Sequence, residues 1–328
     1  LDCSRGCSSC AVPQKYNKEQ ELTVEETGLT IDWLHSERYR FLSYLGGEPF
    51  APFRTKEDIT FFEHTRRIVQ YAAQKGMVVN VTTNGDYVDK ENVELLKQAG
   101  LNTLTYSLHT YTKESLNHLL KVARLTAEAG IVSTIQAVLT KDTAEKLPGV
   151  AAVAARNGLL FVVGLVQEKG GGFSTQQKES LLSSEEEQRK IFGALLRLKT
   201  FGFLVNTRDY LMHAPDFYPN NWTCDSEKDT FIHIGAGTGG TVNVCSDVRT
   251  DLRIQDIGTL DSPVWRDKKR DLVRNCGNCL FHCYYETQKP DLIGDAPTGI
   301  LVGLIKAGQV EAVRKLGDIA VRLSSRGE

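Results

Sequence analysis

The stretch MVVNVTTNGDYVDKENVELLKQAGLNTLTYSLH, residues 77–109, has the pattern of one strand–helix–strand unit. Short apolar runs at Met77–Thr82 and Thr103–Ser107 predict two strands, and the amphipathic run between them, near 87–99, predicts a helix. Gly100 falls where this helix should end, in the place of a C-terminal cap. Two strands joined by a helix in this way lie parallel in one sheet.

The same alternation continues on both sides of this unit. It predicts further strands at Tyr39–Leu45, Ser133–Leu139 and Leu160–Val166. It predicts helices near 57–75, 112–129 and 142–157, with Gly76, Gly130 and Gly158 at their ends. These five strands, and one more that would precede Cys3, predict an α/β fold built as a partial (βα)6 TIM-like barrel.

The pattern changes in the last third of the chain. After a helix near 185–200 and a short strand near 203–206, loops rich in Gly, Asn and Asp carry five cysteines. The charged stretch Arg266–Arg270 is expected to be solvated helix surface, and residues 298–324 to form one or two closing helices. The predicted organisation is therefore a barrel domain, a small cysteine-bearing domain and a helical tail, with the limits 1–206, 207–297 and 298–328.

The overall composition excludes several classes of protein. The 328 residues include 39 basic and 41 acidic side chains, so no basic excess attracts nucleic acid. Apolar residues make up 41%, as in globular proteins, and no apolar run approaches the ~18 residues of a membrane helix. No basic-then-apolar leader opens the sequence. Eight cysteines are too sparse for a disulfide scaffold, and close spacings such as C-x2-C suit metal or cluster ligation better, so a reducing, cytoplasmic setting is expected.

The first group of cysteines stands at the head of the predicted barrel. Cys3, Cys7 and Cys10 have the spacing C-x3-C-x2-C. Three thiolates on one short loop suit three irons of a [4Fe–4S] cluster and leave the fourth iron open. Zinc is the alternative, but a structural zinc site takes four ligands and no fourth Cys or His lies nearby.

Three further motifs fall at the ends of predicted strands. They are Gly46-Gly47-Glu48-Pro49, Thr82-Thr83-Asn84-Gly85 and Ser107-Leu108-His109. Parallel α/β folds bind ligands at the carboxyl ends of their strands. With the cysteine triplet, this ordered set resembles the radical S-adenosylmethionine (radical SAM) superfamily over roughly residues 1–206.

The resemblance implies a set of site residues. Cys3, Cys7 and Cys10 would hold the [4Fe–4S] cluster, whose open iron takes the amino and carboxylate groups of S-adenosylmethionine (SAM). Glu48 would order its loop, and His109 and Glu48 are the candidate catalytic residues. The implied SAM contacts are Gly46, Gly47, Glu48, Pro49, Thr83, Asn84, Ser107, Gln136 and Val166. Ser9 stands where most of the superfamily has a bulky residue that packs on adenine, and Val12 is a neighbour placed to take over that packing.

The second group of cysteines resembles the SPASM/twitch extensions of radical SAM enzymes. Cys224, Gly240 and Cys245 have the spacing C-x15-G-x4-C, and a C-x2-C-x3-C group follows at Cys276, Cys279 and Cys283. The resemblance implies one auxiliary Fe–S cluster, [4Fe–4S] in type, held by four of these five thiolates, with Cys224 and Cys245 the firmest. The alternative is a structural zinc site on Cys224, Cys245, Cys276 and Cys279. The upstream barrel favours the Fe–S cluster.

Two nearby patterns have simpler interpretations. Gly235–Gly240 matches G-x-G-x-x-G, but it opens no predicted helix, so it is expected to be a hairpin or turn rather than a dinucleotide site. Tyr284, Tyr285 and Glu286 follow the last cysteine and are expected to pack in the interior, with the barrel mouth as the alternative.

The sequence thus predicts a radical SAM enzyme that forms a 5′-deoxyadenosyl radical and modifies an unactivated carbon of a small-molecule biosynthetic intermediate. A flavodoxin- or ferredoxin-type electron donor is implied. The alternatives are a maturase of a ribosomally made peptide, adenosyl addition to an alkene, and a zinc-stapled binding protein without enzymatic activity. The sequence does not distinguish oxidoreductase, transferase and bond-forming subclasses.

Overall fold

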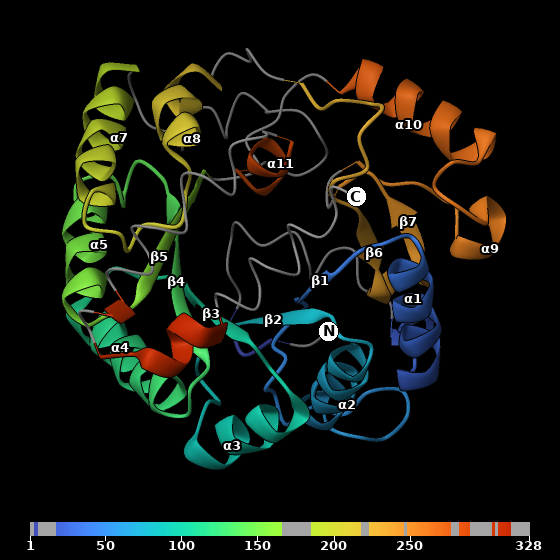
Figure 1. Cartoon of the computed structure of the whole chain (residues 1–328), viewed down its shortest axis with the longest axis horizontal. Coiled ribbons are helices and arrows are strands. Elements are labelled where there is room, and N and C mark those ends of the chain that lie inside the picture. Colours follow the sequence, from blue (N-terminus) through green and yellow to red (C-terminus); the bar gives the residue numbers. More distant parts are fainter. Residues whose placement is uncertain are drawn as a thin grey trace.

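The computed structural model describes residues 3–5, 18–165, 185–217, 223–245, 248–276, 282–288, 304–305 and 308–315. Its centre is a five-stranded parallel sheet with the strands in chain order, which forms a half-barrel (Figure 1). Each strand lies within two residues of its predicted bounds. The strands are β1 (Phe41–Tyr44), β2 (Val78–Thr83), β3 (Thr103–Leu108), β4 (Val132–Leu139) and β5 (Leu160–Leu165).

A sixth segment continues this sheet at the β5 edge. The backbone N–H of Phe161 donates to Phe203 O (2.8 Å), and the N–H of Val205 donates to Phe161 O (2.8 Å). The short strand predicted near 203–206 is therefore a single parallel bridge beside β5. The strand predicted to precede Cys3 lies outside the described residues.

The connecting helices end within one residue of their predicted ends, but they begin up to five residues after their predicted starts. The side chains of Thr60, Asp89 and Thr112 accept the backbone N–H three residues later and so cap the first turns of α2, α3 and α4. The four predicted terminal glycines all have positive φ angles, from 72° to 96°. The barrel helices are α2 (Phe61–Gln74), α3 (Lys90–Ala99), α4 (Lys113–Glu128), α5 (Leu147–Arg156) and α7 (Glu185–Lys199).

The two faces of the sheet differ in polarity. On β3, Leu104 and Tyr106 are fully buried towards the helices, and the Tyr106 hydroxyl donates to Val122 O of α4 (3.2 Å). Figure 1 shows these helices along the outside of the curved sheet. The alternate residues of β3 face the inner side, where Thr103 and Thr105 donate to Asn80 Oδ1 on β2 (2.8 and 2.9 Å). The inner face is therefore polar near its centre.

Helix α1 (Val24–Ser36) was not expected from the sequence. A capping box starts it: Thr23 Oγ1 accepts the Glu26 N–H (3.0 Å), and the Glu26 carboxylate accepts the Thr23 N–H (2.8 Å). Gly28 interrupts the helical pattern, which explains why the helix was missed. The T-x-x-E spacing at 23–26 was the available signal.

The C-terminal part combines short helices with a two-stranded hairpin. The elements are α8 (Arg208–His213), β6 (His233–Gly235), β7 (Thr241–Asn243), α9 (Ile254–Ile257), α10 (Pro263–Asn275) and α11 (His282–Thr287). Strands β6 and β7 are antiparallel. The residues expected to form the closing helices lie mostly outside the described ranges, and the three domain limits stay predictions.

The expectation for Arg266–Arg270 was wrong in one respect. Lys269 on α10 is 3% exposed, because its ammonium donates to Asp229 Oδ1 (2.9 Å) and to Lys228 O (2.7 Å). Trp265, also buried, donates to the same carboxylate oxygen (3.1 Å). A charged stretch can therefore bury one of its cations where a partner carboxylate is available.

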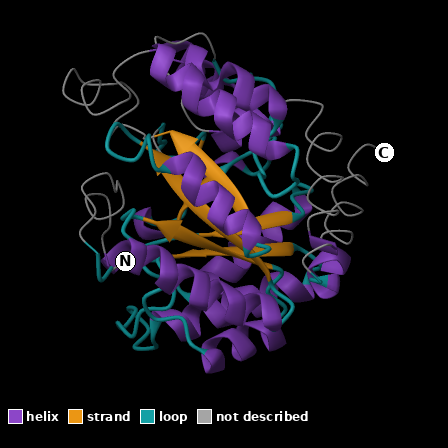
Figure 2. Cartoon of the chain, turned by 90° about the vertical axis from the view of Figure 1, so that its left-hand side faces the viewer, coloured by secondary structure: helices purple, strands orange, loops and turns teal. Residues whose placement is uncertain are grey.

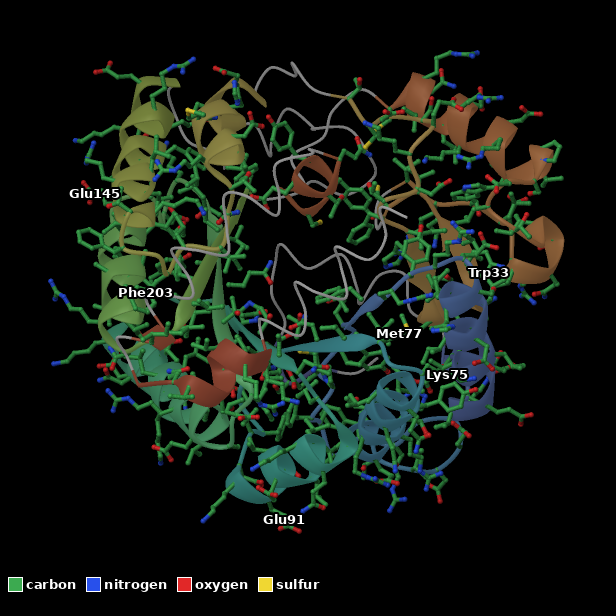
Figure 3. The ribbon with its side chains drawn as sticks, viewed as in Figure 1. Trp33, Lys75, Met77, Glu91, Glu145 and Phe203 are labelled. Carbon is green, nitrogen blue, oxygen red and sulfur yellow. The ribbon has the colours of Figure 1, made fainter. Side chains whose placement is uncertain are left out.

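Several hydrogen bonds attach this C-terminal part to the start of the barrel. The N–H of Leu22 donates to Ala236 O (2.9 Å), and the Tyr39 hydroxyl donates to Asp229 O (2.7 Å). Trp33 on α1, labelled in Figure 3, donates from Nε1 to Gly258 O (2.6 Å). Figure 2 shows helices packed around the sheet. Within the described ranges, no helix has both the length and the apolar character to cross a membrane.

The helix-end glycines give a test of the fold. We expect Gly100→Ala to destabilise the protein more than Gly76→Ala. Both have positive φ (96° and 77°), which costs a side chain about 1–2 kcal/mol. A Cβ at position 100 would also lie 2.7 Å from the Ala73 Cβ, whereas nothing lies within 4 Å at position 76. The added overlap should cost a further ~1–3 kcal/mol.

The measurement is anaerobic denaturant unfolding followed by circular dichroism. Gly149→Ala is the matched control, because Gly149 lies in α5 with open space around it and without a positive φ. It should stabilise the protein by about 0.5–1 kcal/mol. Equal losses at positions 76 and 100 would contradict the contact with Ala73.

Candidate functional site

The three strand-end motifs meet at one edge of the sheet. Gly46–Pro49 follows β1, Thr83–Gly85 ends β2, and Ser107–His109 ends β3. Because β1, β2 and β3 are parallel neighbours, their carboxyl ends lie at the same edge. Sequence reasoning therefore placed these motifs together correctly.

Glu48 connects the first two motifs through its buried carboxylate. The side chain is 1% exposed and accepts three hydrogen bonds. Its Oε1 accepts the Thr83 hydroxyl (2.5 Å) and the Phe50 N–H (3.1 Å), and its Oε2 accepts the Asn84 N–H (2.8 Å). Burial raises the pKa of Glu48, and the three donors oppose that rise. Glu48 thus orders the loops after β1 and β2, which makes it a positioning residue.

The loop after β2 in turn holds the first cysteine. Asn84, 4% exposed, donates from Nδ2 to Ser4 Oγ (3.3 Å) and to Cys3 Sγ (3.8 Å). Cys3 Sγ also accepts the backbone N–H of Arg5 (3.5 Å). These donors favour a thiolate at Cys3, so the described part of the cysteine loop fits a cluster ligand. Cys7 and Cys10 lie outside the described residues, as do Ser9 and Val12.

Sequence reasoning missed a second link to this loop. Asp86 accepts the Ser4 hydroxyl (3.0 Å) and the Arg5 Nε (2.8 Å), and a second Arg5 nitrogen pairs with its other oxygen. The hydrogen bond and charge of Arg5 lower the pKa of Asp86. Asp86 follows the TTNG motif directly, which was the available signal, although nothing in the sequence named Arg5 as its partner.

The remaining candidates lie on the inner face or beside it. Ser107 and Gln136 are register partners on β3 and β4, and both are half-buried. His109 stands at the end of β3, and partial desolvation, followed by the charge of Arg5, lowers the pKa of its imidazole. Val166 lies outside the described residues. The assignment of SAM contacts to any of these residues stays a prediction.

Three of the C-terminal cysteines gather in one cluster. Cys245 and Tyr284 are buried together, and Cys224, Cys283 and Val248 pack against them, as does Phe231. Burial raises the pKa of the Cys283 thiol to about 12. Cys276 ends α10 and is not part of this cluster, and Cys279 lies outside the described residues. All described cysteines are free of disulfides.

The described cysteines of this cluster do not form a ready-made site for a single metal ion. Among the residues that the structure describes, no three His, Cys, Asp or Glu side chains are arranged to hold one metal ion. Cys245 Sγ accepts the Val248 N–H (3.2 Å), a contact that stabilises a thiolate. The donors present therefore suit sulfur ligation without forming a mononuclear site by themselves.

Helix α11 joins the cysteine cluster to the end of the barrel. Glu286 Oε1 accepts the Thr207 N–H at the start of α8 (2.6 Å), and the Tyr285 hydroxyl donates to Asp209. Tyr284 packs on Phe231 with ring centroids 4.2 Å apart. Tyr284, Tyr285 and Glu286 are all buried, which confirms packing over exposure at the barrel mouth.

The Gly235–Gly240 segment is a hairpin connection, as predicted. It ends β6 and leads directly into β7, with Gly239 and Gly240 at φ 71° and 76°. No helix of the dinucleotide-binding kind follows it. The hairpin lies in the segment between Cys224 and Cys245, as the glycine-bearing spacing predicted.

The parallel half-barrel with ligand motifs at its strand ends defines an α/β enzyme fold of the partial TIM-like class. The family model of the Radical SAM superfamily matches residues 2–142. This segment is therefore a radical SAM domain. The superfamily uses a [4Fe–4S] cluster and SAM, which agrees with the cofactors expected from the sequence.

The curated relatives that match parts of the chain include two with named activities. The Fe-coproporphyrin III synthase of Methanosarcina barkeri is 32% identical over 107 residues, which is 32% of this chain and 24% of that protein. The PqqA peptide cyclase of Granulibacter bethesdensis is 25% identical over 157 residues, 44% of this chain and 39% of that protein. The matches thus span well under half of the relatives' own lengths.

Solved structures show the same fold over most of the chain. The structure "Native anSMEcpe with bound AdoMet" has a TM-score of 0.58 at 13% identity and covers 99% of this chain and 96% of its own. Streptococcus suis SuiB bound to its precursor peptide SuiA has a TM-score of 0.56 at 17% identity, with coverage of 88% and 71%. At these identities the likeness establishes the fold alone.

Glu48 allows a direct test of how the site is held together. We expect Glu48→Gln to lower the free energy of unfolding by about 1–3 kcal/mol, because one amide cannot accept all three buried donors. The Asn84 amide should also lose hydrogen-exchange protection, since its N–H donates to Glu48. Denaturant unfolding and exchange mass spectrometry measure the two effects.

Glu26→Gln serves as the control. Its carboxylate also accepts a backbone N–H, from Thr23, but it lies at the surface, so its loss should cost less than about 1 kcal/mol. Equal effects of the two substitutions, or unchanged exchange at Asn84, would refute the role assigned to Glu48.

Proposed function

We propose that this protein is a radical SAM enzyme whose [4Fe–4S] cluster is held by Cys3, Cys7 and Cys10. A cluster held there would, when reduced, supply the electron for cleavage of SAM to methionine and a 5′-deoxyadenosyl radical, which would take a hydrogen atom from an unactivated substrate carbon. The observation that carries the proposal is the chain of contacts from Glu48 through Asn84 to Cys3, which unites the strand-end motifs with the cysteine loop.

Different residues around the cluster would contact different groups of SAM. Gly46 and Gly47 have no Cβ, so their backbone can approach the methionine amino group. Ser107 and Gln136, adjacent in register on the inner face, are placed for the ribose. Val166 and Pro49 stay expected SAM contacts, and His109 stays the candidate catalytic residue. Glu48 would act by fixing the loops, because its buried carboxylate accepts donors from the loop after β1 and from the end of β2.

We further propose one auxiliary Fe–S cluster in the C-terminal part. Cys224, Cys245 and Cys283 support it, because they come from three separate segments and pack around Tyr284. The fourth ligand would be Cys276 or Cys279. The radical SAM domain upstream favours an Fe–S cluster here over a structural zinc site.

A peptide side chain is the substrate class that the comparisons favour. The structures that match most of the chain include SuiB with its precursor peptide, and anSMEcpe was solved with Kp18Cys and Cp18Cys peptides. A matched curated relative is named a peptide cyclase. A small biosynthetic molecule is the second candidate, favoured by the relative named Fe-coproporphyrin III synthase. A flavodoxin- or ferredoxin-type protein would supply the electron.

Anaerobic reconstitution tests the cofactor content. We expect about eight iron atoms per chain in the wild type and about four in the Cys3/Cys7/Cys10→Ala variant, because each [4Fe–4S] cluster contributes four. With dithionite and SAM, only the wild type should release 5′-deoxyadenosine, measured by liquid chromatography. Zinc without iron in both proteins would overturn the proposal in favour of a zinc-stapled binding protein.

Single cysteine variants test the auxiliary site. Cys283→Ala should lower the iron content from about eight to about four, since it removes a ligand of the packed cluster. Of Cys276→Ala and Cys279→Ala, we expect one to behave like Cys283→Ala and the other to keep about eight. Full iron content in Cys283→Ala would show that this thiol only packs.

A further inference from the structure

Both polar atoms of the Asn84 side-chain amide form hydrogen bonds to neighbouring protein groups. Its Oδ1 accepts the Asp86 N–H (2.8 Å), and its Nδ2 donates to Ser4 Oγ and Cys3 Sγ (3.3 and 3.8 Å). An amide nitrogen has two hydrogens, which matches the two acceptors that it meets here. At 4% exposure, the side chain is buried against these partners instead of being open to a SAM carboxylate.

Asp86 fixes the same short segment from the other side. Its carboxylate accepts the Ser4 hydroxyl and pairs with two nitrogens of the Arg5 guanidinium. A two-point pair of this kind fixes orientation as well as distance. The residues that follow Cys3 are therefore bound by two side chains from the loop after β2.

The position of Arg5 has a consequence for the Cys3 sulfur. The Arg5 backbone N–H donates to Cys3 Sγ (3.5 Å), so holding Arg5 also holds this donor. Together with Asn84 Nδ2, two N–H groups point at the sulfur. Hydrogen bonds to ligand sulfurs stabilise the reduced, more negative state of an Fe–S cluster and raise its reduction potential.

We propose that Asn84 is a positioning residue of the cluster loop rather than a SAM ligand, and that its amide raises the reduction potential of the [4Fe–4S] cluster while Asp86 holds Arg5 in place. This proposal rests on the proposed function, because it requires a cluster on Cys3. It changes the role of Asn84, which the resemblance placed among the SAM contacts.

The test compares Asn84→Ala with Asn102→Ala. Asn102 is a similarly buried amide (8% exposed) whose Oδ1 accepts the Val79 N–H (3.0 Å) at the opposite end of the sheet. Both proteins are reconstituted anaerobically, and the cluster whose electron paramagnetic resonance signal responds to SAM is titrated against potential. SAM affinity is measured by equilibrium dialysis on the oxidised protein.

In Asn84→Ala we expect the ratio of reduced to oxidised cluster at a fixed potential to fall about tenfold. This corresponds to a midpoint reduction potential that is lower by about 59 mV for a one-electron couple. SAM affinity should stay within about threefold of the wild type. Asn102→Ala should lose stability but keep the wild-type potential. Asn84→Leu, which is similar in size but has neither an N–H donor nor a charge, should also lower the potential if Asn84→Ala does not fold.

Two results would overturn the proposal. An unchanged potential in both Asn84 variants would remove the role of the amide. A tenfold or larger loss of SAM affinity at constant potential would make Asn84 a SAM ligand after all. A wild-type protein without iron would instead refute the proposed function itself, so the two failures are distinguishable.

Discussion

The buried carboxylate of Glu48 is the interaction on which the candidate site depends. Moving a carboxylate from water into the interior costs several kcal/mol unless donors replace the lost water. Here three donors do so, one from its own loop at Phe50 and two from the end of β2 at Thr83 and Asn84. Because these donors come from both loops, the carboxylate favours the arrangement in which the loop after β1 lies against the end of β2. That arrangement places the Asn84 amide against Cys3, so the first cysteine is positioned through the second strand.

The C-terminal cysteine cluster depends on the barrel in a similar way. The short helix α11 uses Tyr285 and Glu286 to bind α8, while its neighbouring residue Tyr284 packs with Cys245. Burial raises the pKa of Glu286 to about 7, a cost that the hydrogen bond from Thr207 partly offsets. Any change at this junction would therefore alter the cysteine cluster and the end of the barrel together.

Periodic patterns accounted for the sheet and most of its helices. The strands around 77–109 and their capping glycines could be predicted because each signal is local and repeats along the chain. The strand-end motifs were placed correctly for the same reason, since parallel strands bring their carboxyl ends to one edge. The contacts that hold the motifs together were different. Arg5 and Asp86 are 81 positions apart, and no spacing rule links them.

The burial of Lys269 is a second feature that depends on a long-range contact and could not be predicted from the sequence. In the sequence it stands in a run of charges, and its burial follows only from Asp229, which a loop brings to α10. Likewise, the spacing of the last three cysteines could not indicate which of them reaches Cys224 and Cys245. Packing points to Cys283, which lies with Cys224 against the buried Cys245 and Tyr284, on a helix that is hydrogen-bonded to the start of α8.

The polarity of the inner face gives a reason for the contacts that α1 and the C-terminal part make with the barrel. Asn80 satisfies its amide with Ser43, Thr103 and Thr105, so the centre of the inner face is held by hydrogen bonds rather than by apolar packing. A surface of this kind contributes little hydrophobic stabilisation. Stability must come from the apolar outer face and from the contacts of α1 and the C-terminal part. A half-barrel built in this way keeps polar, half-buried side chains beside the strand ends, where a polar cofactor would bind.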